Sequence, residues 1–378
     1  MKKYLKLLII SVIFIVFTSV VIFNNVIFSF AEEDFSGAEI VIERDSLRVL
    51  KGRNVDKKLS NASTTKIVTA ITVIENCDLD KKVVITKESV GVEGSSIYLK
   101  EGDILTVREL LYGLMLRSGN DAAVALALVV GGSVENFAKM MNTLSCKCGA
   151  VNSNFVNPHG LYDENHYTTA KDLALICAYA LRNETFAKIV RTKKITFGSR
   201  TFLNKNKMLF NYEGADGVKT GYTKKAGRCL VSSATKNGMQ LICVILNYPA
   251  TYERTTELFD QCFLEYSLTE VVNKNDVIAK IPVKNAVELN KEYSVSLNRS
   301  LYLPISKDEK KSLKIEFLPT EYLTEPINKG EYLGILSITT DKDLIFSSKL
   351  YTINTNEKRE FLKTLIGVLA RWRVYAYK

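Results

Sequence analysis

The sequence predicts an α/β domain, then a smaller all-β domain, then a C-terminal amphipathic helix. A length of 378 residues is enough for two domains. Helical and strand patterns alternate as far as about residue 268, whereas residues 270–353 alternate short strand patterns with polar turns and lack a long helix. Because 47% of the residues are hydrophobic and 24% are charged, the composition is that of a globular protein and excludes a disordered chain.

The first 31 residues predict a signal peptide. Lys2, Lys3 and Lys6 precede an apolar stretch, and Ser29 and Ala31 place small residues where a signal peptidase would cleave. The apolar stretch is longer than the usual ~7–15 residues. An uncleaved single-span anchor is therefore the alternative. Either way we expect the rest of the chain to be exported, at the outer face of the cytoplasmic membrane or in the cell wall.

The net charge indicates which classes of partner to expect, and the cysteine and histidine content indicates whether a metal site is expected. A net charge of +10 favours contact with anionic lipid or wall polymer, and it is spread without the arginine–aromatic interleaving typical of nucleic-acid binding. Seven cysteines are an odd number, and several stand in apolar runs, so we expect free and mostly buried thiols. With only two histidines and no second cysteine pair at finger-like spacing, no metal site is predicted.

The α/β region begins with two predicted strands, Ala38–Ile42 and Leu47–Leu50. An apolar helical run then starts at Ile67, directly after Ser63 and Lys66, which stand three positions apart. On a helix such residues share a face, so the hydroxyl and the amine would lie within reach. A serine nucleophile needs a neighbouring base, and a partly buried lysine can serve as one. The alternative is an N-cap serine followed by a solvated lysine.

A second polar motif, Ser118-Gly119-Asn120, is predicted to lie on a tight turn between two helices. The helical run from Val107 to Leu116 ends just before it, and another begins at Asp121. Glycine is tolerated in such turns, and the polar side chains can project from them. A turn that only caps the second helix is the alternative.

A third motif is Lys219-Thr220-Gly221. It falls on a predicted strand, followed by another strand and an Asn-Gly hairpin at Asn237-Gly238. Lys219 would lie on a strand edge, and Gly221 would leave space for a substrate backbone. A helix from Tyr252 to Leu268 is expected to close the region.

The C-terminal segment, residues 357–378, predicts an amphipathic helix. Its apolar face would be formed by Leu362, Leu365, Ile366, Leu369 and Trp372, and the remaining positions are rich in Lys and Arg. A basic amphipathic helix with a tryptophan is typical of a membrane interface. A terminal helix packed on its own domain is the alternative.

Together the three motifs resemble those of low-molecular-weight penicillin-binding proteins of the serine D-alanyl-D-alanine carboxypeptidase family (peptidase family S11). The match covers roughly residues 36–268, and residues 270–353 and 357–378 extend it. The wider segments around Ser63, Ser118 and Lys219, and the loop at residues 157–161, resemble the family's longer signatures. The resemblance implies an antiparallel sheet sandwiched by helices, with no cofactor.

The resemblance also implies a role for each motif residue. Ser63 would attack the penultimate D-alanine of a peptidoglycan stem peptide, and Lys66 would take its proton. Ser118 and Asn120 would relay protons and hold the substrate amide, while Lys219 would support the electrostatics. The substrate-binding residues would be Thr220, Gly221, Tyr222 and, by counting along the chain, Arg254, with Thr220 on the terminal carboxylate and the Ser63 and Tyr222 N–H groups as the oxyanion hole.

The resemblance predicts a carboxypeptidase that β-lactams inhibit. A β-lactamase is an alternative, but the second domain, the membrane-type tail and the lack of a deacylation segment near residues 157–172 argue against it. A catalytically idle wall-binding protein is another alternative, but such a protein would have no need of Ser63, Lys66 and Lys219 together.

Overall fold

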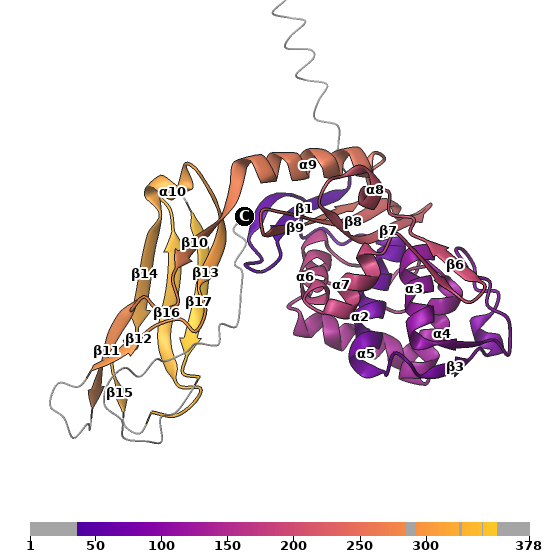
Figure 1. The fold of residues 1–378 in the computed structure, drawn as a ribbon, viewed down its shortest axis with the longest axis horizontal. Coiled ribbons are helices and arrows are strands. Elements are labelled where there is room, and N and C mark those ends of the chain that lie inside the picture. Colours follow the sequence, from indigo (N-terminus) through magenta and orange to yellow (C-terminus); the bar gives the residue numbers. More distant parts are fainter. Residues whose placement is uncertain (1–35, 285–291, 325–326, 342, 354–378) are drawn as a thin grey trace, which may run out of the picture. The chain divides into compact units, whose positions relative to one another are not determined.

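The structure, a computed structural model, describes residues 36–284, 292–324, 327–341 and 343–353 (Figure 1). The predicted signal peptide (1–31) and the predicted amphipathic helix (357–378) lie outside the described residues. The predicted α/β region and the all-β region are both confirmed as fold classes.

A five-stranded antiparallel sheet forms the centre of the first domain. Its order is β2-β1-β9-β8-β7, which leaves β7 at one edge. The bounds are β1 Ala38–Glu43, β2 Val49–Arg53, β7 Ala215–Thr223, β8 Gly227–Lys236 and β9 Met239–Leu246. The hairpin between β8 and β9 turns at Asn237-Gly238, where both residues have positive φ, so the predicted Asn-Gly turn is confirmed.

Helices cover both faces of this sheet (Figure 1). One face contacts α6 Ala170–Leu181, α7 Glu184–Arg191 and α2 Lys66–Asn76, and the other contacts α9 Thr251–Glu265. Three further helices, α3 Val107–Arg117, α4 Asn120–Gly131 and α5 Val134–Lys147, pack around α2. Small elements complete the domain: η1 Ala62–Thr65, η2 Lys87–Ser89, β3 Lys82–Val84, β4 Ile104–Thr106, β5 Lys194–Phe197, β6 Arg200–Leu203 and α8 Met208–Asn211. The antiparallel sheet between helices is the predicted architecture.

Local capping explains where several of these helices begin. Thr106 and Glu109 form a reciprocal capping box at the start of α3, and the Thr169 hydroxyl accepts a hydrogen bond from Asp172 N at the start of α6. The last helix differs from its prediction, because α9 ends at Glu265 and Tyr266 already begins a strand. Its β-branched and aromatic continuation favours extended backbone over another helical turn.

The second domain is built from short strands. Two pair as β10 Tyr266–Val272 with β13 Leu301–Ser306, three as β12 Glu292–Val295, β11 Ala279–Lys284 and β15 Leu323–Thr324, and three as β14 Lys314–Pro319, β16 Tyr332–Thr339 and β17 Leu344–Tyr351. The single-turn α10 Glu309–Ser312 is its one helix among the described residues. The strands bury their own apolar core, which includes Leu303, Leu336 and Ile338.

Among the described residues, no single helix has the length and apolar character needed to cross a bilayer. One pair, α4 and α5, meets the length and composition requirement together, although the two helices meet at 84°.

Candidate active site

Ser63 lies on a 3-10 turn and not within an α-helix. The turn η1 spans Ala62–Thr65, and α2 begins only at Lys66. Residues i and i+3 eclipse one another in a 3-10 turn, so the spacing that predicted a shared helical face still brings Ser63 and Lys66 together. Ala62 has a φ of 48°, an uncommon value for a residue other than glycine. The turn leaves Ser63 partly exposed while Ala62 and Thr64 on either side are buried.

Lys66 is the centre of the site. Its side chain is 0% exposed, and its Nζ lies 2.8 Å from Ser63 Oγ, 2.7 Å from Asn120 Oδ1 and 2.7 Å from the carbonyl oxygen of His159. Among the described residues it forms no ion pair with a carboxylate. Burial, followed by the nearby charges of Lys219 and Lys205, holds the pKa of Lys66 well below its ordinary value. A neutral amine beside a serine hydroxyl can accept its proton.

The second motif turns into the site as predicted. Ser118 ends α3 with a φ of 63°, and Asn120 is the first residue of α4. Asn120 is fixed at three points: its backbone N–H donates to Ser95 O, its Nδ2 donates to Glu93 O, and its Oδ1 accepts from Lys66. The Ser118 side chain is buried beside it, without a hydrogen bond to Ser63 or Lys66 among the described residues.

Lys219 is a second buried lysine. Its side chain is 1% exposed on the edge strand β7, and its Nζ donates to Thr220 O at 2.9 Å. Burial, with a smaller contribution from Lys205, lowers the pKa of Lys219 to about 7. Its charge in turn depresses the pKa of Lys66. The two amines therefore act on each other electrostatically although no hydrogen bond joins them.

Gly221 allows β7 to approach the nucleophile turn. A Cβ on Gly221 would lie 3.1 Å from Asn61 O and 3.2 Å from both Ser63 N and Thr64 N. Any side chain there would push β7 away from η1. The edge of β7 and the Ser63 N–H consequently lie side by side, the arrangement that an extended substrate and an oxyanion hole need.

Arg254 is bound by two glutamates, Glu39 and Glu257. Its Nε and Nη2 donate to the two carboxylate oxygens of Glu39 at 2.9 and 2.7 Å, and its Nη1 donates to Glu257 at 2.8 Å. Glu39 is a buried acid on β1 and needs a cation. The geometry therefore gives no support to the predicted contact between Arg254 and the substrate carboxylate.

Three features of the site were not foreseen from the sequence. The Asp121 carboxylate accepts from Ile97 N, Leu99 N and Ser96 Oγ, so it ties the loop at residues 93–99 to the Asn120 turn. The His159 carbonyl binds Lys66, and Lys205 donates to Ser95 Oγ at 3.1 Å. Asp121 directly follows the Ser-Gly-Asn triplet, which is the one signal that could have pointed to it.

The two histidines have structural surroundings. His166 Nε2 lies 2.8 Å from Thr65 Oγ1, and its Nδ1 accepts from Val156 N. Burial lowers the pKa of His166 to about 4 and that of His159 to about 3. Both imidazoles are therefore neutral at physiological pH, as expected of groups that position the loop at residues 157–161 and do not act as acids. Among the described residues no group of His, Cys, Asp and Glu has the arrangement of a metal site.

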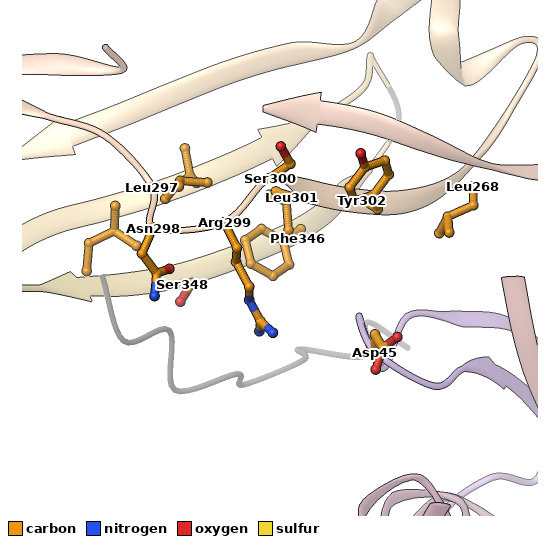
Figure 2. A pocket seen from close by; sticks show the side chains of 12 residues that line it. Asp45, Leu268, Leu297, Asn298, Arg299, Ser300, Leu301, Tyr302, Phe346 and Ser348 are labelled. Atoms are coloured by element: carbon orange, nitrogen blue, oxygen red, sulfur yellow. The ribbon is translucent and has the colours of Figure 1, made fainter. Parts of the chain in front are cut away.

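Two cavities differ in their relation to these residues. One of about 280 Å³ is bordered by residues of β7, β8 and α9, among them Thr220, Tyr222, Arg228 and Tyr252. Another of about 270 Å³ is formed largely by the second domain, where Leu297, Arg299 and Phe346 contribute to its wall (Figure 2). None of the predicted site residues borders the second cavity.

Comparison with known proteins places this geometry in a family. A model described as D-alanyl-D-alanine carboxypeptidase matches residues 29–250, and a model described as penicillin-binding protein 5, C-terminal domain, matches residues 266–358. The chain is 33% identical over 346 residues to the D-alanyl-D-alanine carboxypeptidase DacF of Bacillus subtilis (strain 168), covering 88% of this chain and 89% of that protein. It is 32% identical to DacC of Escherichia coli (strain K12), covering 86% and 85%.

A solved structure agrees with the sequence relatives. Penicillin binding protein 5 from Haemophilus influenzae matches with a TM-score of 0.75 and 28% sequence identity, covering 84% of this chain and 96% of that chain. Both domains therefore take part in the likeness, and the resemblance stated from the three motifs is confirmed. The chain belongs to the D-alanyl-D-alanine carboxypeptidase family.

Proposed function

We propose that this chain removes the terminal D-alanine from peptidoglycan stem peptides through an acyl-enzyme on Ser63. The observation that supports this best is the buried Lys66 amine, held within 2.8 Å of Ser63 Oγ and 2.7 Å of Asn120 Oδ1. The family membership and the carboxypeptidase relatives supply the substrate class. A catalytically idle wall-binding protein would have no need of a fully buried lysine that lacks a carboxylate partner at this position.

The acylation step follows from the geometry. Ser63 Oγ attacks the carbonyl carbon of the penultimate D-alanine while its proton passes to Lys66 Nζ. The backbone N–H groups of Ser63 and Tyr222 would stabilise the oxyanion. As the C–N bond breaks, the leaving D-alanine amine takes up a proton from Lys66, with Ser118 and Asn120 as relays. The products are D-alanine and an ester on Ser63.

Deacylation returns the enzyme to its starting state. A water molecule attacks the ester carbonyl and gives a proton to Lys66 Nζ. The Ser63–acyl bond then breaks, Lys66 returns that proton to Ser63 Oγ, and the shortened peptide leaves with a free carboxylate. Lys219 would favour the negative charge that develops in both steps, and the edge of β7 would pair with the extended peptide.

A fluorescent penicillin tests this function. We expect a stable covalent label on the wild type and none on Ser63→Ala, because penicillin would acylate the same hydroxyl. Release of D-alanine from a stem peptide should be lost in the same variant. A label that disappears quickly with drug hydrolysis would instead favour a β-lactamase, and the absence of any label or D-alanine release would favour an idle fold.

Export and membrane attachment are part of the proposal. Residues 1–31 would direct export, and residues 357–378 would bind the outer leaflet as an amphipathic helix. After cleavage of the signal peptide, a chain that ends at Asn354 should leave the membrane fraction. Retention of that shortened chain on membranes would contradict the role given to the tail.

A further inference from the structure

A cation without a counter-charge lies on the strand next to Thr220. Arg228 is exposed near the start of β8, and its guanidinium makes no ion pair or hydrogen bond with any residue that the structure describes. Most other arginines of this domain near the sheet are engaged, as Arg44 is with Asp45 and Arg254 with Glu39. An unpaired guanidinium beside a cavity is a binding group for an anion.

The strand register places Arg228 on the same face of the sheet as Thr220. In the β7–β8 pair, Tyr222 lies opposite Arg228 and Thr220 opposite Leu230. Side chains two positions apart on a strand share a face, so Thr220, Tyr222 and Arg228 project from the same face of the sheet. Arg228 is then the diagonal neighbour of Thr220, at a spacing of about 7–8 Å that a long side chain can reach across.

These side chains border one cavity. Its volume is about 280 Å³, and it is bordered by Thr220, Tyr222 and Arg228 together with Thr251 and Tyr252 from the first turn of α9. The positive charge of Arg228 acts on the Tyr252 hydroxyl, where it opposes the rise in pKa caused by burial. The start of a 15-residue helix adds partial positive charge at the same wall.

The competing cation is not available in this arrangement. Three donor nitrogens of Arg254 are bound to Glu39 and Glu257, which neutralises its charge and fixes its direction. To bind a substrate it would first have to leave Glu39, a carboxylate that is 4% exposed. Glu39 would then keep only its longer, 4.0 Å contact with Arg53, and weakening the pairing of a buried carboxylate is unfavourable.

We propose that Arg228, together with the Thr220 hydroxyl, binds the terminal carboxylate of the substrate and so selects peptides with a free C-terminus. This assignment rests on the proposed carboxypeptidase function. With Ser63 on one side of β7 and the Thr220–Arg228 pair beside its outer face, a peptide lying along the β7 edge presents its penultimate carbonyl to Ser63 and its terminal carboxylate to Arg228. A peptide whose C-terminus is blocked leaves Arg228 unpaired.

The test compares two substrates that differ only in that charge. One is a stem peptide that ends in D-Ala-D-Ala with a free carboxylate, and the other is its C-terminal amide. In the wild type we expect kcat/KM to be higher for the carboxylate. In Arg228→Gln it should fall by about 10- to 100-fold for the carboxylate, the range expected for a charge-assisted hydrogen bond, and change little for the amide. Arg228→Lys should recover part of the loss.

Controls separate this assignment from folding and from the function itself. Arg228 is exposed, so Arg228→Gln should keep its melting temperature, and Arg108→Gln, on an exposed arginine paired with Asp80, should leave both substrates unchanged. Unaltered preference for the carboxylate in Arg228→Gln, with the preference lost in Arg254→Gln, would overturn the assignment and restore Arg254. A wild type that neither cleaves the peptide nor takes up penicillin would overturn the function and the assignment together.

Discussion

The two domains differ in the kinds of polar side chain that they bury. The catalytic domain buries two lysine side chains, Lys66 and Lys219, at 0% and 1% exposure, without a carboxylate partner among the described residues. The described part of the C-terminal domain buries only hydroxyl-bearing polar residues, and the ion pairs formed between its own described residues, such as Lys314 with Asp341, lie on the surface. Buried unpaired charge is unfavourable for folding. The contrast therefore locates the chemistry in the first domain without reference to any motif.

Removing the first buried lysine should have the largest effect on activity. Lys66→Met keeps the length and apolar stem of the side chain but removes the base that receives the Ser63 proton. We expect the rate of penicillin acylation to fall at least about 1000-fold, within the range that a general base contributes. Stopped-flow or gel-based acylation kinetics would measure it. Acylation within tenfold of the wild type, in a folded variant, would remove Lys66 from the mechanism.

The second buried lysine should make stability depend on pH. The pKa of Lys219 is about 7 in the folded chain and near 10.5 when unfolded, so between these values the unfolded chain binds a proton that the folded chain does not. The free energy of unfolding should therefore rise with pH from 7 toward 10.5, by up to about 1.4 kcal/mol per pH unit from this group. Below pH 7 Lys219 is protonated in both the folded and the unfolded chain, so it no longer makes the free energy of unfolding depend on pH.

Urea unfolding of the wild type and Lys219→Met at pH 7, 8 and 9 isolates this contribution, because the other groups largely cancel in the difference. The wild type should gain stability relative to the variant as the pH rises. Parallel curves would mean that Lys219 titrates in the folded chain as it does in water.

Asp121 should have an intermediate effect. Asp121→Asn retains one acceptor oxygen but turns an N–H₂ group toward the N–H donors of Ile97 and Leu99, so the loop at residues 93–99 should loosen around Asn120. We expect acylation to slow by about 10- to 100-fold, with a loss of about 1–3 kcal/mol in stability. Asp80→Asn, at an exposed ion pair, is the matched control. Equal acylation rates in both variants would contradict a positioning role.

A core substitution in the second domain should have the smallest effect on the reaction. Leu336 is 1% exposed in β16, and Leu336→Ala should destabilise that domain by about 2–5 kcal/mol while acylation of Ser63 is unchanged. Leu116→Ala, equally buried in α3 directly before the Ser118 turn, should lower both stability and acylation. If Leu336→Ala also slowed acylation, the separation drawn between the two domains would be wrong.

Much of this arrangement could be predicted from the sequence, for reasons that differ by residue. The pairing of Ser63 with Lys66 follows from local spacing and from residue chemistry, whereas the role of Asn120 is implied by the family resemblance. The geometry brings these three side chains together. The edge position of β7 agrees with the expectation for Lys219, but the order of the other strands is a tertiary fact that no local pattern contains.

The features that could not be predicted depend on contacts between distant segments. Asp121 binds a loop that lies 22–25 residues earlier in the chain, and the His159 carbonyl reaches Lys66 from 93 residues away. The expectation for Arg254 depends on its distance along the chain, and that distance cannot show that Glu39 on β1 already binds it. A pattern of apolar residues also cannot distinguish the 3-10 turn at Ser63 from the first turn of an α-helix.

The distribution of thiols makes the catalytic domain separately observable. All seven cysteines fall between Cys77 and Cys262, and none lies in the C-terminal domain. Cys146 is exposed, whereas Cys177, Cys229 and Cys243 are buried and their pKa values are raised by burial. A maleimide reagent would mark Cys146 at once and reach the buried thiols only when the first domain opens. The rate at which the buried thiols react would therefore report the opening of the first domain, without any engineered label.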